Sequence, residues 1–145
     1  SPEAFLALCD GWCALDVTGD VRITEDTWPA ADLTALSCLR SVSAGDGVGE
    51  GLLSLFDQPG VTSLASLHRL ERLDGKLSVS DLPELTSLAG LEQLGPIGGL
   101  YLEGLPRVDD LSPLAGTRGA RQVAVVPLPV RDLSPLAGHN TAALD

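Results

Sequence analysis

The sequence is poor in aromatic residues, lysine and histidine. Its 145 residues include two Phe, two Trp and one Tyr, although 44% of them are hydrophobic. A core with so few rings has to be built from aliphatic side chains. The two histidines, His68 and His139, lack the partner spacing that a tetrahedral zinc site requires. We therefore expect an aliphatic core, no bound metal and no cofactor.

Long apolar runs are also absent. No stretch approaches the roughly 18 apolar residues of a membrane span, and no charged segment leads into an apolar one as in a secretion leader. The formal net charge is −11, so phosphate groups would be repelled. These features argue against a nucleic-acid partner and against membrane insertion. The length suits one domain over residues 1–145.

Leucine at regular spacing is what the sequence has in abundance. From Val79 to Leu91 an apolar residue recurs at every third position. Strand-like segments precede such ladders, and their marker residues recur about every 23 residues, at Leu55, Val79, Leu102 and Val125. This spacing is in the period range of leucine-rich repeats. The interval from an earlier copy at Ile23 to Leu55 exceeds the others, so one coil is longer.

Repetition with this period predicts a solenoid. A coil of about 23 residues cannot bury its own apolar side chains, so it must stack on equivalent coils. Each coil opens with an apolar, polar, apolar segment such as Leu77-Ser78-Val79, which sends alternate side chains to opposite faces of a strand. Prolines in Leu82-Pro83 and Leu105-Pro106 mark the return turns. We predict an α/β repeat solenoid of about five coils with one parallel β-sheet.

The segment at residues 110–116 recurs at residues 132–138. Its serine before proline is typical of a helix N-cap with proline in the first helical position, and its glycine ends the turn. We predict a single helical turn in both copies, and at residues 64–67 and 88–91. Asp110 and Asp132 align between coils, which indicates turn capping. Asp109 aligns with Arg131, which indicates a solvated ion pair. We therefore do not interpret the adjacent Asp109 and Asp110 as a catalytic carboxylate pair.

The two ends and one loop depart from the repeat. Residues 1–13 contain a helix start at Ser1-Pro2-Glu3 and apolar residues to cover the first coil, so we predict a short N-terminal capping helix. Residues 139–145 form a C-terminal tail. The glycine-rich segment 45–51 accounts for the long coil; it lacks the lysine of a phosphate loop and has too few acids for calcium. We predict that it is a flexible protruding loop.

Three cysteines leave one without a partner in the chain. Cys9 and Cys13 are four residues apart and would share one face of the predicted N-terminal helix, close to disulfide reach. We predict a disulfide between Cys9 and Cys13 in preference to one between Cys13 and Cys38. In a third interpretation all three cysteines are reduced and act as small hydrophobic residues.

Several of these motifs resemble known families. The run Leu91-x-x-Leu94-x-x-Ile97-x-x-Leu100-x-Leu102 is similar to bacterial internalin-type leucine-rich repeats, although the asparagine that usually follows the strand is missing. Residues 75–79 and the cysteine-led segment 13–24 resemble the receptor L domain, the ligand-binding module of insulin and epidermal growth factor receptors. The resemblance covers roughly residues 9–138 and implies a right-handed, leucine-rich-repeat-like coil. In that family the cysteine before the first strand pairs with an upstream one.

A candidate binding surface follows from the strand alternation. Residues next to the inward-facing strand positions line an open face, and apolar, aromatic and charged residues on such a face are typical of protein interfaces. The candidate partner-binding residues are Arg22, Leu52, Phe56, Lys76, Tyr101, Glu103 and Val126.

We expect a non-catalytic module that recognises a protein partner through this face. No serine sits in a nucleophile elbow, and a thin coil has little room for a deep pocket, so we do not expect an enzyme. One Lys beside eight Arg suits a GC-rich bacterial gene, and we expect a mature exported protein in the periplasm, at the cell surface or outside the cell. The alternative is a structural spacer or self-assembly unit of a larger exported bacterial protein.

Overall fold

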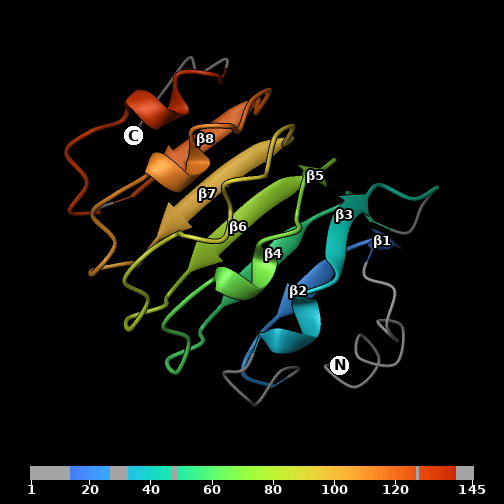
Figure 1. Cartoon of the computed structure of the whole chain (residues 1–145), viewed down its shortest axis with the longest axis horizontal. Helices are drawn as coiled ribbons and strands as arrows, with labels where there is room; N and C mark the ends of the chain where they lie inside the picture. Colours follow the sequence, from blue (N-terminus) through green and yellow to red (C-terminus); the bar gives the residue numbers. More distant parts are fainter. Residues whose placement is uncertain (1–13, 27–32, 47–48, 127, 140–145) are drawn as a thin grey trace.

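Parallel strands from successive coils form the main sheet of the protein (Figure 1). The computed structural model describes residues 14–26, 33–46, 49–126 and 128–139. Five strands lie in the order β2-β4-β6-β7-β8, and the chain makes about four turns where about five coils were predicted. The strands are β2 Val21–Ile23, β4 Leu53–Phe56, β6 Lys76–Ser80, β7 Gly99–Glu103 and β8 Gln122–Val125.

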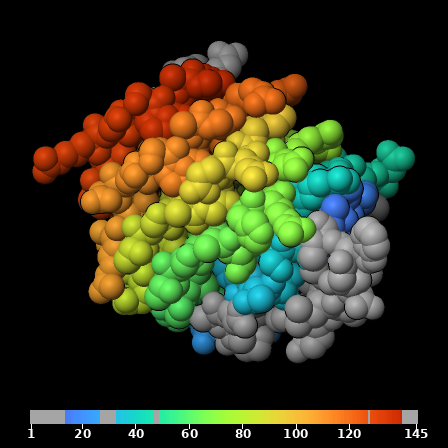
Figure 2. Space-filling model, in the orientation of Figure 1, coloured from blue at the N-terminus to red at the C-terminus, as the bar shows by residue number. Residues whose placement is uncertain are grey.

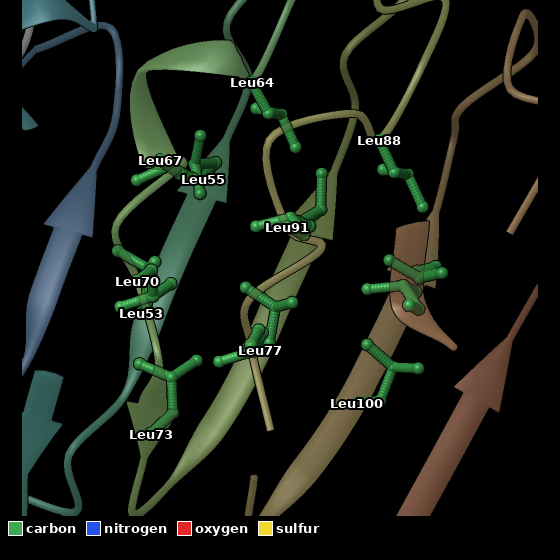
Figure 3. Close-up of a cluster of buried hydrophobic side chains, with 14 of the residues drawn as sticks. Leu53, Leu55, Leu64, Leu67, Leu70, Leu73, Leu77, Leu88, Leu91 and Leu100 are labelled. Atoms are coloured by element: carbon green, nitrogen blue, oxygen red, sulfur yellow. The ribbon is translucent and has the colours of Figure 1, made fainter. Parts of the chain in front are cut away.

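The register of this sheet stacks equivalent aliphatic residues. Leu53 pairs with Leu77, Leu77 with Leu100, and Leu100 with Val123. These inward-facing residues are buried, as predicted, and Val125 at the last strand is partly buried. Leucines from the return segments pack against them from the other side, as Figure 3 shows for Leu64 and Leu88. The core is therefore a set of aliphatic columns that run from coil to coil.

A second parallel sheet corrects the prediction of one sheet. Strands β1 Leu15–Thr18, β3 Leu39–Ser43 and β5 Arg72–Leu73 pair in that order. In the following coils, an isolated β-bridge pairs Pro96 with Arg118, and this bridge is also parallel. Each early coil thus holds two strands, which are joined by a tight corner at residues 19–20 and 74–75 and by the longer segment 44–52 between β3 and β4. In the first coil, Gly19 at that corner has a φ of 112°.

The return side contains short 3-10 turns: η1 Thr34–Leu36, η2 Ala65–Leu67, η3 Ser112–Leu114 and η4 Ser134–Leu136. None of these described helices is long enough to cross a bilayer. The turns at Ser112 and Ser134 confirm the predicted helical turns, but the serines are not the caps. Asp110 and Asp132 accept the Ser112 and Ser134 N–H groups at 2.8 and 2.9 Å, so capping by aspartate is confirmed.

Residues 88–91 form a turn instead of the predicted helical one. The Leu91 N–H still bonds the Leu88 carbonyl, at 3.3 Å. Gly90 has a φ of 115°, and a Cβ atom there would lie 2.1 Å from the Leu64 carbonyl oxygen. Only glycine fits this close approach between coils, and its backbone conformation is incompatible with a 3-10 helix.

The turns that follow strands β4, β6 and β7 contain aspartate or glycine in a left-handed backbone conformation. Asp57 and Asp81 have φ values of 52° and 56°, and Gly104 has a φ of 63°. Aspartate and glycine adopt the left-handed backbone conformation at a lower energetic cost than most other residues. The Asp57 N–H bonds the Ser80 carbonyl, and the Asp81 N–H bonds the Glu103 carbonyl. The turns therefore stack in register without asparagine.

The glycine-rich segment lengthens the coil between β3 and β4, as predicted. Residues 44–52 join these strands, whereas residues 74–75 join β5 to β6. Gly45 and Gly49 form an isolated antiparallel bridge, and the teal segment after β3 juts out from the body of the coil (Figure 2). Of the described residues in 45–51, Gly45 and Asp46 belong to this protrusion, whereas Gly51 is buried and accepts a hydrogen bond from the Gly75 N–H.

The predicted N-terminal cap at residues 1–13, with Cys9 and Cys13, lies outside the described residues, as does the tail beyond His139. Cys38 is described, buried and disulfide-bonded. The predicted pairing of Cys9 with Cys13 lies outside the described residues, and so does Cys13 of the alternative pairing with Cys38.

Gln58 occupies a position that leucine fills in the following coils. Gln58, Leu82 and Leu105 each precede a proline, and Gln58 is only 3% exposed. Its Nε2 atom is buried and has no hydrogen-bond partner among the described residues. An unsatisfied buried amide destabilises the folded state.

We expect Gln58→Leu to raise the free energy of unfolding by about 1–3 kcal/mol, because it removes the unsatisfied amide and continues the leucine column. Urea denaturation measures the change. Gln93→Leu is the matched control at an exposed glutamine and should stay within about 0.5 kcal/mol. A destabilised Gln58→Leu protein would show that the amide has a stabilising role.

His139 lies in the last described coil and is 7% exposed. The Ala120 N–H donates to Nδ1 at 3.2 Å, and Nε2 lies 2.8 Å from the Thr117 hydroxyl, which in turn donates to the Leu114 carbonyl. This network requires a neutral imidazole with its proton on Nε2. Burial also lowers the pKa of His139 below its ordinary value of 6.5.

We expect the stability contributed by His139 to decrease as the pH falls through about 6.5, because the unfolded chain then binds a proton that the folded chain resists. His139→Ala should reduce the slope of unfolding free energy against pH between about pH 7 and pH 5.5. Equal slopes in the two proteins would contradict this role of His139.

Candidate functional site

The outer face of the main sheet is arranged in rows that cross the strands. One row runs from Arg22 through Ser54, Ser78 and Tyr101 to Ala124. Neighbouring rows contain Phe56, Ser80 and Glu103 on one side, and Lys76, Gly99 and Gln122 on the other. Alternation along each strand places these residues opposite the buried leucines. Arg22, Phe56 and Lys76 are exposed on this face, whereas Ser80 is buried.

Three of the predicted residues form one cluster on this face. The Lys76 Nζ lies 5.7 Å from the centroid of the Tyr101 ring, which is a cation–π distance. Gly99 stands opposite Lys76 and has no side chain, so Lys76 can lean across it towards Tyr101. The Tyr101 hydroxyl donates a hydrogen bond to Glu103. This bond, together with partial burial and the nearby negative charges, raises the pKa of Tyr101.

Phe56 is the most exposed large apolar side chain among the described residues, at 45%. It shares a row with Glu103, and the buried Ser80 stands between them. A small serine leaves room for the larger neighbours to flank it. The face therefore offers an aromatic ring to solvent beside a charged, hydrogen-bonded cluster.

The other predicted residues lie at the margins of this cluster. Arg22 is three strands from Tyr101, which corresponds to about 14 Å. Its Nη2 lies 3.1 Å from the Asp20 carboxylate. Leu52 and Val126 are half-buried, and both have backbone hydrogen bonds to adjacent coils. Leu52 and Val126 thus contribute less accessible surface than Phe56.

A groove that the sequence interpretation missed borders the same face. It has a volume of about 950 Å³ and follows the corner between the two sheets. Its glycines allow the coils to stack closely: a Cβ atom at Gly75 would lie 2.5 Å from the Glu50 carbonyl oxygen, and one at Gly98 would lie 2.3 Å from that of Asp74. Backbone hydrogen bonds join Gly98 to Gly75 and Arg121 to Gly98. The floor of the groove is therefore a ladder of tightly stacked backbone.

Basic side chains without ion pairs gather at this groove. Among the described residues, the arginines at 22, 40, 72 and 107 form salt bridges with carboxylates. Lys76, Arg118 and Arg121 form no such pair within that part of the chain, and all three line the groove. Gly75, Gly98 and Arg121 occupy equivalent positions in successive coils. Their alignment is the feature of the sequence from which this site could have been predicted.

Two acidic residues also line the groove. The Asp74 carboxylate accepts bonds from Arg72 at 2.7 and 2.9 Å and from the Ala44 N–H at 3.1 Å. The hydrogen bond from Arg72 is the main reason that the pKa of Asp74 is lowered. Glu50 lies in the coil of the glycine-rich loop, whereas Arg118 and Arg121 lie towards the last coil. The charge of the groove therefore becomes positive towards the C-terminal coils.

Polar residues on the second sheet are engaged in ion pairs and hydrogen bonds. Asp16 accepts hydrogen bonds from Arg40, and the Ser41 hydroxyl donates to it at 2.7 Å. These bonds, that from Arg40 first, lower the pKa of Asp16 from 3.8 to about 2. The described residues contain no group of three or more acidic, cysteine or histidine side chains placed to hold a metal. The ion pair expected between Asp109 and Arg131, both of them described, is not formed.

Comparisons of the chain with protein-family models, curated proteins and solved structures found no match. A function is therefore inferred from the geometry of the sheet face and of the groove beside it.

We expect Arg40→Ala to raise the pKa of Asp16 from about 2 towards 3.8, because the main group that stabilises its charged form is lost. A carboxyl NMR titration measures this pKa directly. A folded-state pKa that is depressed stabilises the protein above the unfolded value, so this contribution disappears between about pH 4 and pH 2. Arg107→Ala, which disrupts the pair with Glu84, should leave the Asp16 titration unchanged. An Asp16 pKa near 3.8 in the unaltered protein would contradict the assignment.

Proposed function

We propose that this protein is a non-catalytic binding module that recognises a protein partner through the outer face of its main sheet. The observation that carries the proposal is the exposed Phe56 beside the cluster of Lys76, Tyr101 and Glu103. Aromatic side chains supply large contact areas with few rotatable bonds, and they are enriched at interfaces. Repeat proteins commonly bind along an exposed sheet of this kind.

We further propose that the coil is of the right-handed, leucine-rich-repeat type and is similar to the receptor L domain. Parallel strands joined by crossovers are almost always connected with a right hand. The threefold leucine spacing and the repeat of about 23 residues support the same type. The stacked turns at Asp57, Asp81 and Gly104 support it too, since they perform the role that asparagine has in other repeats.

An exported location forms part of this proposal: outside the cell, at the cell surface or in the periplasm of a bacterium. The disulfide at Cys38 supports it, because disulfides persist mainly in oxidising compartments. The arginine-rich, lysine-poor composition suits a GC-rich bacterial gene.

The second candidate is a structural spacer or self-assembly unit of a larger exported protein. Val125, Leu128 and Val130 in the last coils are only partly buried, and Leu133 is 40% exposed. Apolar columns that end in this way are commonly covered by a further repeat or by a second copy. Sedimentation velocity at several concentrations separates the candidates, because assembly predicts dimers, which Leu133→Ala dissociates if they form through this end and Tyr101→Ala dissociates if they form through the sheet. Recognition of a different protein predicts a monomer.

We expect Phe56→Ala and Tyr101→Ala each to weaken binding of the purified partner by about tenfold or more, because each removes an aromatic anchor. A photo-crosslinking residue at Ser78, which lies between them on the face, identifies the partner, and calorimetry then measures its affinity. Leu133→Ala, which removes a comparably exposed apolar side chain outside the sheet, should bind normally. Equal affinity of all four proteins would refute recognition through this face.

A further inference from the structure

The groove beside the sheet face concentrates positive charge on a protein whose net charge is −11. Lys76, Arg118 and Arg121 are exposed there and form no salt bridge with any described residue, while other arginines are engaged by carboxylates. Of the two acids in the groove, Asp74 is already bound to Arg72. Its Oδ2 atom also accepts the Ala44 N–H. The groove is thus an electropositive site on an otherwise acidic molecule.

The length of the groove suits an extended chain. Its lining reaches from Gly75 through Gly98 and Gly119 to Gly138, one residue from each of four successive coils. Three inter-strand spacings of about 4.8 Å give a length of about 14 Å, which equals about four residues of extended polypeptide. Arg118 lies along its floor, with Nη1 only 3.0 Å from the position that a Cβ of Gly95 would take. A single small ion would leave most of this length unfilled.

The chemistry of the lining favours carboxylates. The N–H groups of Gly98 and Arg121 already donate to neighbouring coils, so these floor amides cannot bind a ligand. Side chains must make the contacts, and arginine presents paired donors that match a carboxylate. Lys76 and Gln122 stand on either side of Gly99 at the border with the sheet face. A partner on the sheet could therefore reach into the groove across this gap.

We propose that the groove binds an extended acidic segment of the protein that occupies the sheet face. This inference deepens the proposed function and depends on it, since it assigns a charge to the partner. Carboxylates of the segment pair with Arg118, Arg121 and Lys76. Glu50 at the opposite end repels acids, so the most acidic part of the segment lies towards the last coil.

The test is an NMR titration at low ionic strength with a short glutamate-rich peptide. We expect chemical-shift changes to concentrate at the amides of Gly98, Gly99 and Gly119, and to disappear when salt is added. Replacement of both Arg118 and Arg121 by Ala should weaken binding by about threefold to tenfold, since each exposed charge pair contributes modestly. A lysine-rich peptide of equal length should not bind at the groove.

The matched control is the double variant Arg107→Ala, Arg131→Ala, which removes the same charge from arginines outside the groove. If this control variant weakens peptide binding as much as the Arg118 and Arg121 variant does, the peptide is attracted non-specifically and the proposal is wrong. The same conclusion follows if a sulfated oligosaccharide binds at the groove and the peptide does not. Phe56→Ala should bind the peptide normally, so loss of peptide binding and loss of sheet recognition are separately observable.

Discussion

The stacking of aliphatic side chains between coils is the interaction on which the rest of the structure depends. No coil can bury its own leucines, and each becomes part of a core only when its neighbours supply the equivalent residues. Leu53, Leu77 and Leu100 illustrate this, because each is completely buried although it lies on a different turn. The parallel register, the tight corners and the repeated 3-10 turns all keep such columns aligned. A change in one column therefore affects several coils at once.

The inner columns also determine what the outer surface can offer. Because alternate strand residues are committed to the core, their neighbours must lie on an open face in fixed rows. Lys76 reaches Tyr101 only because the intervening Gly99 has no side chain. The corner glycines that bring the coils close together line the basic groove. A flat aromatic surface and an electropositive channel thus arise together from close backbone stacking.

Much of this fold could be predicted from the sequence, because period and alternation are visible there. The buried positions of Leu55, Val79 and Leu102 followed from the repeat, and so did the outward orientation of Phe56 and Tyr101. The second sheet could not be predicted in this way, since its strands are short and their pairing depends on where the corners fall. The groove depends on distances between coils, which no single segment specifies. The disulfide at Cys38 also required three-dimensional proximity, whereas sequence spacing favoured Cys9 and Cys13.

The most direct test of the account is a methyl NOE experiment on protein with labelled leucine and valine. Contacts between coils predict strong NOEs between the methyl groups of Leu55 and Val79, and between those of Val79 and Leu102, although a full repeat of sequence separates the members of each pair. Comparable NOEs should join Leu53, Leu77 and Leu100. Spectra in which these methyl groups show NOEs only to their near neighbours in the sequence would contradict the stacked coil, and with it the sheet face and the groove.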